Sequence, residues 1–324
     1  MDPAIRLQGV TKSFGPTHAV RGLDLSVPRG ALYGFIGPNG AGKTTSIRMM
    51  MSIVFPDTGE LSVLGHASAR DAKDRIGYLP EERGVYRKMR VGAFLTYIAR
   101  LKGVPEGEVA RRVKRGLEQV DLPDVDRKRC DELSKGMQQK VQLAAAIIHA
   151  PDLLILDEPF SGLDPVSRRQ LRDLILMEHR RGATVLFSTH VMPQAEEICE
   201  HVVMIHEGRK VLDERVSTIH RRYDPRTIRF DPLNHDLDPV PALARVPGVE
   251  RVSRVDGSFD VELAAGTDPG AAIQRITAAV APARVEIARP RLEDVFIQIV
   301  AESGAAAAAI RANLGDQLVP VATT

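Results

Sequence analysis

A glycine-rich loop with the sequence GPNGAGKT carries the residue types that can hold a chain of phosphates. Its spacing fits GxxxxGK[ST], and it follows a buried-strand run at 31–36 and precedes apolar residues at helical spacing. The glycines let backbone N–H groups turn toward a phosphate, Lys43 can reach the terminal phosphates, and the Thr44 hydroxyl can hold magnesium. This context disfavours a chance glycine-rich turn and predicts a nucleotide site.

Two adjacent carboxylates, Asp157 and Glu158, follow the apolar run 153–156 and precede Pro159. A nucleotide site needs a carboxylate at the end of a neighbouring strand to hold the metal, and Asp157 has that position. A second carboxylate beside a magnesium ligand can accept a proton from the attacking water, which makes Glu158 the candidate general base. The alternative is a pair of solvated acids at a strand end. We therefore predict a hydrolase rather than a nucleotide binder alone.

A histidine, His190, follows a further buried-strand run at 184–188 in the sequence STH. Ligands of parallel α/β folds bind at the carboxyl ends of the strands, which is where this residue is expected. A lone histidine is usually structural. Its position nevertheless favours a role in sensing or orienting the lytic water.

Alternating strands and helices must position these groups. The buried-strand runs lie at 31–36, 76–79, 153–156 and 184–188, and helical periodicity begins near Thr44 and covers 91–120 and 165–181. This alternation predicts an α/β fold with a mostly parallel sheet and helices on both faces. Short strand-like pieces in the first thirty residues predict a small antiparallel lobe, and 202–205 with 210–212 a closing strand pair.

The sequence changes in character near Tyr223, where prolines become frequent and strong apolar runs stop. We place a boundary there, between a first domain of residues 1–222 and a small α+β accessory domain of residues 223–303. The second domain reads strand, helix, strand, strand, helix, strand, an order typical of a ferredoxin-like fold. The tail at 304–324 is low in complexity and is expected to be disordered.

Composition excludes several classes of protein. The 324 residues include 44% hydrophobic and 27% charged side chains, with a net charge of +2, so bulk charge does not draw the chain to polyanions or lipid headgroups. No run approaches the roughly 18 to 20 apolar residues that span a bilayer, so any membrane is expected to be crossed by another subunit. Cys130 and Cys199 have neither metal-ligand spacing nor a CxxC pattern, and we expect reduced thiols without chemistry.

Five motifs in order, namely the loop, LSKGMQQK, LLILDEP, SGLD and STH, make roughly residues 1 to 220 resemble the nucleotide-binding subunit of an ATP-binding cassette (ABC) transporter. The resemblance implies a P-loop ATPase fold with a helical subdomain at about 85–150, and ATP and Mg²⁺ as ligands. It implies that Phe14 stacks on adenine, that Asp157 and Glu158 act as above, and that His190 contacts the γ-phosphate. The residues that wrap the phosphates would be Gly37, Pro38, Asn39, Gly40, Ala41, Gly42, Lys43, Thr44 and Thr45.

The resemblance also implies an active dimer. In this family the signature helix points its N-terminus at ATP held by the opposite subunit, so Ser134 and Gly136 would complete a partner's site, and Asp164 would belong to the loop that links the two sites. Here the usual LSGGQ is LSKGM, with Lys135 and Met137 as departures. Since Ser134 and Gly136 remain, we expect the ATP sandwich to survive, and Lys135 could add positive charge near the phosphates.

A second departure concerns Glu81, which aligns with a glutamine that in the family lies near the metal and the lytic water. As a third carboxylate, and a candidate metal ligand, Glu81 would repel Asp157 and Glu158 unless magnesium or Arg83 offsets the charge. The hypothesis that follows is slow or strongly metal-dependent turnover.

The pattern GYLPEERG and the appended domain with LEDVF at 292–296 look most like the exporter branch whose ATPase pairs with an ABC-2-type permease. The expected partners are that membrane permease, received by the segment 82–91, and a second ATP-binding subunit in a homodimer, without nucleic acid. The expected location is cytoplasmic, peripheral on the inner face of the cell membrane. The appended domain is expected to pack or to stabilise the dimer rather than to sense a ligand.

Two alternatives stay open. One is a soluble ATP-dependent switch that acts on nucleic acid or ribosomes, disfavoured by the single cassette and by an aromatic content of only 4%. The other is a degenerate cassette that binds ATP without useful hydrolysis, suggested by Glu81 and Lys135 and opposed by the intact Glu158 and His190.

Overall fold

The computed structural model describes residues 2–82, 84–223, 226–234, 236, 238–255, 257–288 and 291–302. Backbone contacts divide this chain into a larger unit, which includes residues 2–216 and 299–302, and a smaller unit of residues 217–298. The boundary at residues 222 and 223 remains our proposal for the domain division. The tail at 304–324, expected to be disordered, lies outside the described residues.

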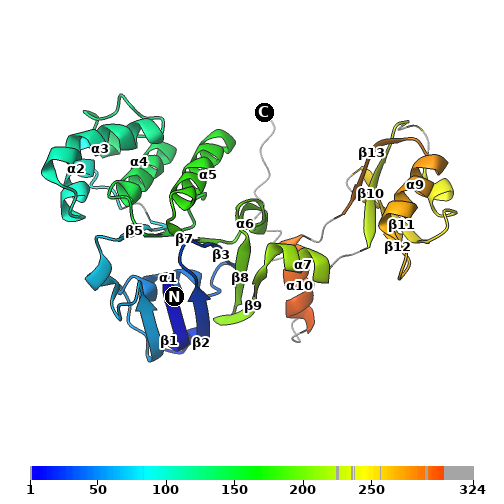
Figure 1. Cartoon of the computed structure of the whole chain (residues 1–324), viewed down its shortest axis with the longest axis horizontal. Helices are drawn as coiled ribbons and strands as arrows, with labels where there is room; N and C mark the ends of the chain where they lie inside the picture. The colour runs from blue at the N-terminus through cyan, green and yellow to red at the C-terminus, as the bar shows by residue number, and fades with distance from the viewer. Residues whose placement is uncertain are drawn as a thin grey trace. The chain divides into compact units, whose positions relative to one another are not determined.

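A six-stranded sheet forms the centre of the larger unit, in the order β5-β6-β7-β3-β8-β9 (Figure 1). Its strands are β3 (Leu32–Ile36), β5 (Ile76–Leu79), β6 (Leu153–Asp157), β7 (Thr184–Thr189), β8 (His201–His206) and β9 (Arg209–Arg215). All neighbours pair in parallel except β8 and β9. The expected mostly parallel sheet with a closing strand pair is thus confirmed, and the carboxyl ends of β3, β6 and β7 meet at one edge.

A separate antiparallel sheet makes the lobe that the N-terminal sequence predicts. It contains β1 (Ile5–Phe14), β2 (Thr17–Val27) and β4 (Thr58–Val63) in the order β2-β1-β4. The sequence did not predict β4, because only Val63 of its six residues is buried and its apolar pattern is therefore weak. The strand β4 is defined by its antiparallel pairing with β1, in which Ile5 lies opposite Val63 and Leu7 lies opposite Leu61.

The helices of the larger unit are α1 (Lys43–Met50), α2 (Val91–Leu101), α3 (Glu106–Gln119), α4 (Lys135–Ile147), α5 (Pro165–Arg180) and α6 (Met192–Ile198), with short 3₁₀ turns at Ala69–Ala72 and Cys130–Glu132. The helical periodicity expected over 91–120 is divided between α2 and α3. Gly103, with φ of +75°, and Pro105 interrupt it, since neither favours a continuous helix. In Figure 1, α2, α3 and α4 stand together at one end of this unit, as the helical subdomain that the resemblance implied.

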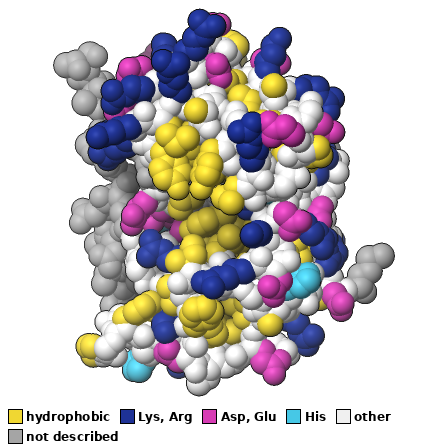
Figure 2. All heavy atoms as spheres, turned by 90° about the vertical axis from the view of Figure 1, so that its left-hand side faces the viewer, with side chains coloured by type: hydrophobic (Ala, Val, Ile, Leu, Met, Phe, Trp, Pro, Cys, Tyr) yellow, Lys and Arg dark blue, Asp and Glu magenta, His cyan; other side chains and the backbone are white. Residues whose placement is uncertain are grey.

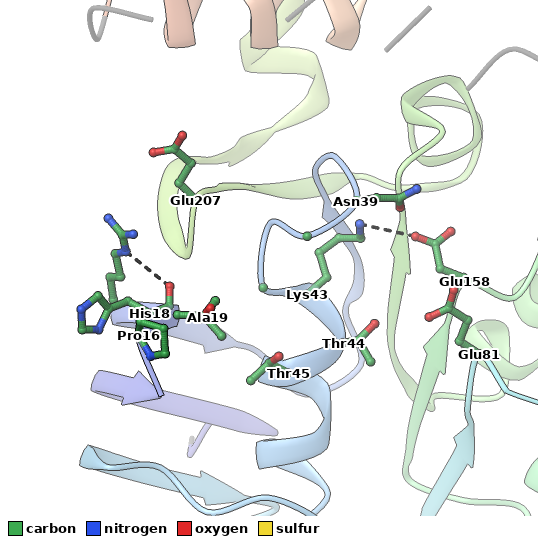
Figure 3. Close-up of a pocket in the computed structure, with 14 residues that line it drawn as sticks. Pro16, His18, Ala19, Asn39, Lys43, Thr44, Thr45, Glu81, Glu158 and Glu207 are labelled. Carbon is green, nitrogen blue, oxygen red and sulfur yellow. Dashed lines mark hydrogen bonds and ion pairs between the residues drawn. The ribbon is translucent and has the colours of Figure 1, made fainter. Parts of the chain in front are cut away.

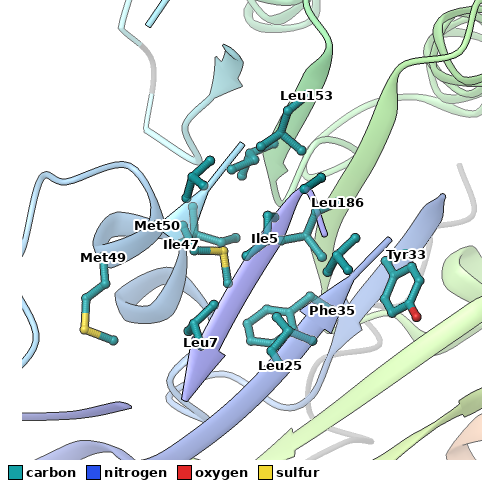
Figure 4. Packing of buried hydrophobic residues seen from close by; sticks show 14 of the residues in the cluster. Ile5, Leu7, Leu25, Tyr33, Phe35, Ile47, Met49, Met50, Leu153 and Leu186 are labelled. Carbon is teal, nitrogen blue, oxygen red and sulfur yellow. The ribbon is translucent and has the colours of Figure 1, made fainter. Parts of the chain in front are cut away.

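A buried hydrophobic cluster joins the antiparallel lobe to the central sheet (Figure 4). It contains Ile5 and Leu7 of β1, Phe35 of β3, Ile47 of α1 and Leu186 of β7, all of them buried. Burial of such side chains stabilises the fold by roughly 1.5–3 kcal/mol each. This cluster fixes α1, and so the loop that precedes it, against the sheet.

The smaller unit has a four-stranded antiparallel sheet in the order β11-β12-β10-β13. Its elements are β10 (Thr227–Pro232), α8 (Val240–Leu243), β11 (Val249–Val255), β12 (Ser258–Leu263), α9 (Pro269–Ala279) and β13 (Pro282–Ile287), with most of α7 (Val216–Arg222) and the first part of α10 (Leu292–Glu302). With strand order 4-1-3-2 along the chain, it has the split βαβ arrangement that the sequence predicts. Its core contains Phe230, Val261 and Ile276.

Within the residues that the structure describes, no helix combines the length and apolar character needed to span a membrane.

Candidate functional site

The glycine-rich loop connects β3 to α1, and two of its glycines are required by close contacts. A Cβ atom on Gly37 would lie 2.2 Å from the carbonyl oxygen of Ile205, and one on Gly42 would lie 2.3 Å from that of Ala19. Gly42 also has φ of +105°, which a residue with a side chain rarely adopts. The loop is thus held between the β1–β2 hairpin and β8, with its backbone shaped for an anion.

Lys43 begins α1, and its ammonium group lies inside the loop (Figure 3). Nζ donates to the carbonyl oxygens of Gly37 at 2.8 Å and Pro38 at 3.2 Å, and lies 3.5 Å from Glu158 Oε1. Burial lowers the pKa of Lys43, and the nearby Glu158 carboxylate opposes that shift. The cation is therefore placed within reach of bound phosphate groups, and its charge is balanced first by Glu158 and then by Asp157 and Glu81.

Glu158 lies between two other site residues. Its Oε2 is 2.9 Å from His190 Nδ1, and its Oε1 faces Lys43. Glu158 has φ of +49°, a left-handed conformation that is uncommon for a residue with a side chain. The Ser188 hydroxyl oxygen accepts from the Glu158 backbone N–H at 3.0 Å and holds this turn. The predicted base and the predicted histidine are thus direct neighbours.

Asp157 ends β6 and is buried. Its Oδ1 accepts from Ser188 Oγ at 2.6 Å and from Thr44 Oγ1 at 3.3 Å, whereas its Oδ2 has no hydrogen-bond partner among the described residues. Burial raises the pKa of Asp157, because the charged form is poorly solvated there. A buried carboxylate oxygen without a donor, beside a threonine hydroxyl, fits a hard divalent cation.

The protein supplies few ligands for such a cation. Over the described parts of the chain, no three His, Cys, Asp or Glu side chains come together as a metal cluster. Magnesium is usually held by one or two carboxylates together with substrate phosphates and water, so Asp157 and Thr44 suit Mg²⁺ bound with a nucleotide better than a resident metal ion.

Glu81 follows β5 and lines the same cleft, close to Glu158 in Figure 3. Its pKa is raised, first by burial and then by the charges of Asp157 and Glu158, while Lys43 opposes the shift. Burial, together with the Asp157 charge, also raises the pKa of Tyr78 to about 12. The repulsion of Glu81 by Asp157 and Glu158 that the sequence suggested is therefore reflected in the raised pKa of Glu81. Arg83, which we expected to offset this negative charge, lies outside the described residues.

A cleft of about 620 Å³ runs from the loop to the β1–β2 hairpin. Of the predicted residues it is lined by Asn39, Gly40, Gly42, Lys43, Thr44, Thr45, Glu81 and Glu158. Its other lining residues were missed by sequence reasoning: Pro16, Thr17, His18, Ala19, Arg21 and Glu207. The turn at Gly15 and Pro16 was visible in the sequence, but only the fold brings the hairpin beside the loop. The turn between β8 and β9 links the two, since Arg21 N donates to Gly208 O at 2.8 Å and Gly208 N donates to Ala41 O at 2.9 Å.

Phe14, the predicted adenine-stacking residue, is not among the lining residues. Its side chain is 51% exposed, and Lys12 Nζ lies 5.5 Å from its ring centroid. His18, in contrast, lines the cleft, and its Nδ1 lies 2.9 Å from Ser13 Oγ. Two rings are therefore available near the end of the cleft that is far from Glu158.

Ser134, Gly136 and Asp164 do not line this cleft. Ser134 is the N-cap of α4, with Oγ accepting from Met137 N at 3.3 Å, and Asp164 is the N-cap of α5, accepting from Val166 N and Ser167 N at 3.0 Å. No residue in the described part of the chain accepts from the Gly136 N–H. The Gly136 N–H at the N-terminus of α4 is therefore free to donate to an acceptor from outside the chain.

Comparison with known proteins gives two matching family profiles. The family described as "ABC transporter" matches residues 20–161, and "ATP-binding protein DrrA1-3-like, C-terminal domain" matches residues 215–300. The first profile lies within the larger unit, and the second spans the smaller one.

Individual relatives agree with these profiles. The chain is 35% identical to an uncharacterized ABC transporter ATP-binding protein, YhaQ of Bacillus subtilis, over 91% of this chain and 98% of that protein. It is 30% identical to the daunorubicin resistance ATP-binding protein DrrA3 of Streptomyces coeruleorubidus, over 93% and 97% of the two chains. A solved structure, that of an ATP-binding subunit of an ABC transporter, superposes with a TM-score of 0.63 at 29% identity, covering 68% of this chain and 93% of that one.

Proposed function

The chain belongs to the family of ABC transporter ATP-binding subunits, whose members hydrolyse ATP to power transport, and from that premise we propose that it is the motor of an export system. The observation that carries the proposal is the contact of Lys43, at the start of α1, with Glu158, and of Glu158 with His190, beside the buried Asp157 at the carboxyl ends of parallel strands. Relatives named for bacitracin transport and for daunorubicin and linearmycin resistance support export. Nothing in their names favours the switch on nucleic acid or ribosomes.

The proposed reaction assigns a role to each side chain. Backbone N–H groups of the loop bind the phosphates of ATP, and Lys43 turns from the loop carbonyls to the terminal phosphates. Glu158 accepts a proton from the attacking water as the water's oxygen forms its bond to the γ-phosphorus and the bond to the β,γ-bridging oxygen breaks. His190, in contact with Glu158, orients that carboxylate and contacts the γ-phosphate.

Magnesium is part of the proposal because of the orphan Oδ2 atom of Asp157. Thr44 and Asp157 would hold the ion, with Glu81 nearby. When bound, Mg²⁺ supplies charge neutralisation for the phosphate oxygens of ATP. The charge that it brings would also lower the raised pKa values of Asp157 and Glu81.

We further propose that a second copy of the chain completes each site. The support is the free Gly136 N–H at the N-terminus of α4, where the helix dipole favours an anion, together with the position of Ser134 and Gly136 outside their own chain's cleft. Asp164 would lie in the loop that links the two sites. A homodimer then contains two identical composite sites.

The proposed membrane partner is an ABC-2-type permease, bound through the segment 82–91 at the inner face of the cell membrane. Tyr86 of this segment is exposed and lies 5.9 Å, ring to ring, from Tyr97 of α2, which is also exposed. Figure 2 shows hydrophobic side chains gathered along the middle of the face that carries α2. Such a contiguous apolar surface suits a protein partner.

The composite site is tested by the variant Gly136→Asp, which places a carboxylate at the mouth of α4. The space at Gly136 accepts a Cβ atom, the nearest contact being Leu163 Cδ2 at 3.6 Å. We expect the monomer to bind ATP as the wild type does, but to lose ATP-driven dimerisation and hydrolysis through repulsion of the partner's phosphates. Weaker ATP binding by the monomer itself would assign Gly136 to its own site and contradict the proposal. Lys43→Ala, which should lose ATP binding outright, serves as the comparison.

A further inference from the structure

A groove of about 620 Å³ lies on the helical subdomain, well apart in sequence from the nucleotide site. Its apolar lining comes from α2 and α3 and includes Ala93, Val113 and Leu117. Its basic lining residues are Arg90, Lys114 and Arg127. A hollow that combines an apolar floor with three cations suits an anion that carries an apolar part.

The three cations are available to a ligand. Neither Arg90 nor Arg127 forms an ion pair with any residue that the structure describes, and both are exposed. Lys114 is 81% exposed and approaches only Glu118, at 3.9 Å, a contact of little energetic value at a surface. Asp126 is the acidic lining residue, and it lies against Gly92 in the first turn of α2, where the helix dipole offsets part of its charge.

Two basic segments that are distant in sequence meet beside the groove. Residues 87–90 read RKMR and residues 127–129 read RKR. An antiparallel bridge pairs Arg90 with Arg129, Cys130 N donates to Met89 O, and Val91 N donates to Lys128 O. The pairing gathers six cations into one basic ridge, of which only Arg129 forms an ion pair with an acidic residue in the described chain, namely Asp131. The net charge of +2 conceals this patch.

Exposed tyrosines adjoin the basic ridge. Tyr86 directly precedes the first basic segment, and its ring contacts those of Phe94 and Tyr97 on α2. In Figure 2, lysine and arginine side chains gather in the upper part of the face, at the height of α2 and α3 in Figure 1, above the hydrophobic side chains. Tyrosine rings together with lysine and arginine are typical of surfaces that sit at the level of lipid headgroups.

We propose that the groove and the basic ridge form a binding surface for anionic phospholipid headgroups. The cations attract the negative surface of the membrane, and the groove takes the phosphate end of a lipid with its glycerol esters and the start of an apolar acyl chain. The apolar floor and the tyrosines favour a lipid over a nucleic acid, whose backbone would need cations alone. The inference goes beyond the motor role, since it involves no residue of the nucleotide site. Residues 87–90 also belong to the segment 82–91 that we propose binds the permease, so the proposal adds a lipid contact beside that partner.

Vesicle binding tests this surface with the full chain, free of any permease. We expect binding to vesicles that contain phosphatidylglycerol, weakening as salt is raised, and none to vesicles of phosphatidylcholine alone. The triple variant Arg90→Gln, Lys114→Gln, Arg127→Gln should lose at least about tenfold in this binding. A matched triple, Arg70→Gln, Lys73→Gln, Arg180→Gln, removes the same charge from exposed positions elsewhere and should bind as the wild type does.

Equal loss in the two triple variants, or equal binding to neutral vesicles, would overturn the proposal. Competition by millimolar inorganic phosphate would identify a small-anion site instead, and tighter binding of a short RNA through the same residues would identify a nucleic-acid surface. Lys114→Glu, a change at a residue that is 81% exposed, provides a second variant that should weaken vesicle binding with little cost to folding. ATP hydrolysis without lipid should be unchanged in every one of these variants, which separates this proposal from the motor role.

Discussion

The ammonium nitrogen of Lys43 lies 3.5 Å from the Oε1 atom of Glu158, and the two side chains are only 5% and 6% exposed. The phosphate-binding cation and the proposed base thus compensate each other before ATP arrives. Leaving either one alone in this buried position would be costly, because an unpaired buried charge is poorly solvated. Binding of ATP replaces this pair, since the phosphates offer Lys43 a stronger partner and leave Glu158 to His190 and the attacking water.

Glu81 is predicted to slow hydrolysis. The variant Glu81→Gln removes a carboxylate whose raised pKa reflects burial and the charges of Asp157 and Glu158. We expect a higher rate of ATP hydrolysis at saturating magnesium, because one charge that repels Asp157 and Glu158 is removed, and half-maximal turnover at a higher magnesium concentration, because the site loses a negative group. The measurement is steady-state turnover against magnesium concentration, with Glu82→Gln, a largely exposed neighbour, as the control. Unchanged rate and unchanged magnesium dependence would refute this role.

Asp157 is predicted to make the nucleotide-free protein less stable as the pH rises. Its folded-state pKa is raised above the usual 3.8, so the folded protein binds this proton more tightly than the unfolded chain. Stability therefore falls as the pH rises from about 3.8 through the raised folded-state pKa. At neutral pH, Asp157→Asn should melt at a higher temperature than the wild type without ATP, and the difference should shrink in acid.

The N-cap residue Asp164 is predicted to have the opposite effect, so that its contribution to stability grows as the pH rises. Hydrogen bonds at the N-terminus of α5 lower its pKa, so its contribution is present above the usual value of 3.8 and is lost as the pH falls through the folded-state pKa. Asp164→Ala should therefore lower the melting temperature at neutral pH. If Asp157→Asn, like Asp164→Ala, lowers the melting temperature at neutral pH, the inference that the charged Asp157 carboxylate destabilises the fold is wrong.

The base of ATP is predicted to bind against Phe14. Because that ring is largely exposed and lies outside the cleft lining, Phe14→Ala should leave the fold intact while weakening ATP binding by about fivefold, near 1 kcal/mol of stacking. Binding is measured by calorimetry on the monomer, with tripolyphosphate as the ligand that lacks a base and should not respond. If Phe14→Ala binds ATP with full affinity and His18→Ala binds it more weakly, the adenine base contacts His18 rather than Phe14.

Much of the site could be predicted because its signals are local. The GPNGAGKT loop, the Asp157–Glu158 pair and His190 each follow a buried strand, and parallel strands bring their carboxyl ends to one edge. Thr44 and Asp157, both predicted to hold magnesium, are hydrogen-bonded at 3.3 Å in the structure. Local spacing therefore carried both the fold class and the chemistry.

The remainder depends on contacts between distant segments. The position of His18 and Glu207 at the cleft depends on how the β1–β2 hairpin and the turn before β9 meet the loop, and no spacing in the sequence records that. The basic ridge likewise requires residues 87–90 to pair with 127–129, across the whole of α2 and α3.

The most direct test of the motor role is ATP hydrolysis by Glu158→Gln, compared with Glu60→Gln, an exposed change on β4. Loss of the general base should lower turnover by about a hundredfold or more, while ATP still binds and still drives two chains together, because Lys43 and Gly136 are intact. Turnover near the wild-type rate in Glu158→Gln would remove this residue from the role of base and contradict the account.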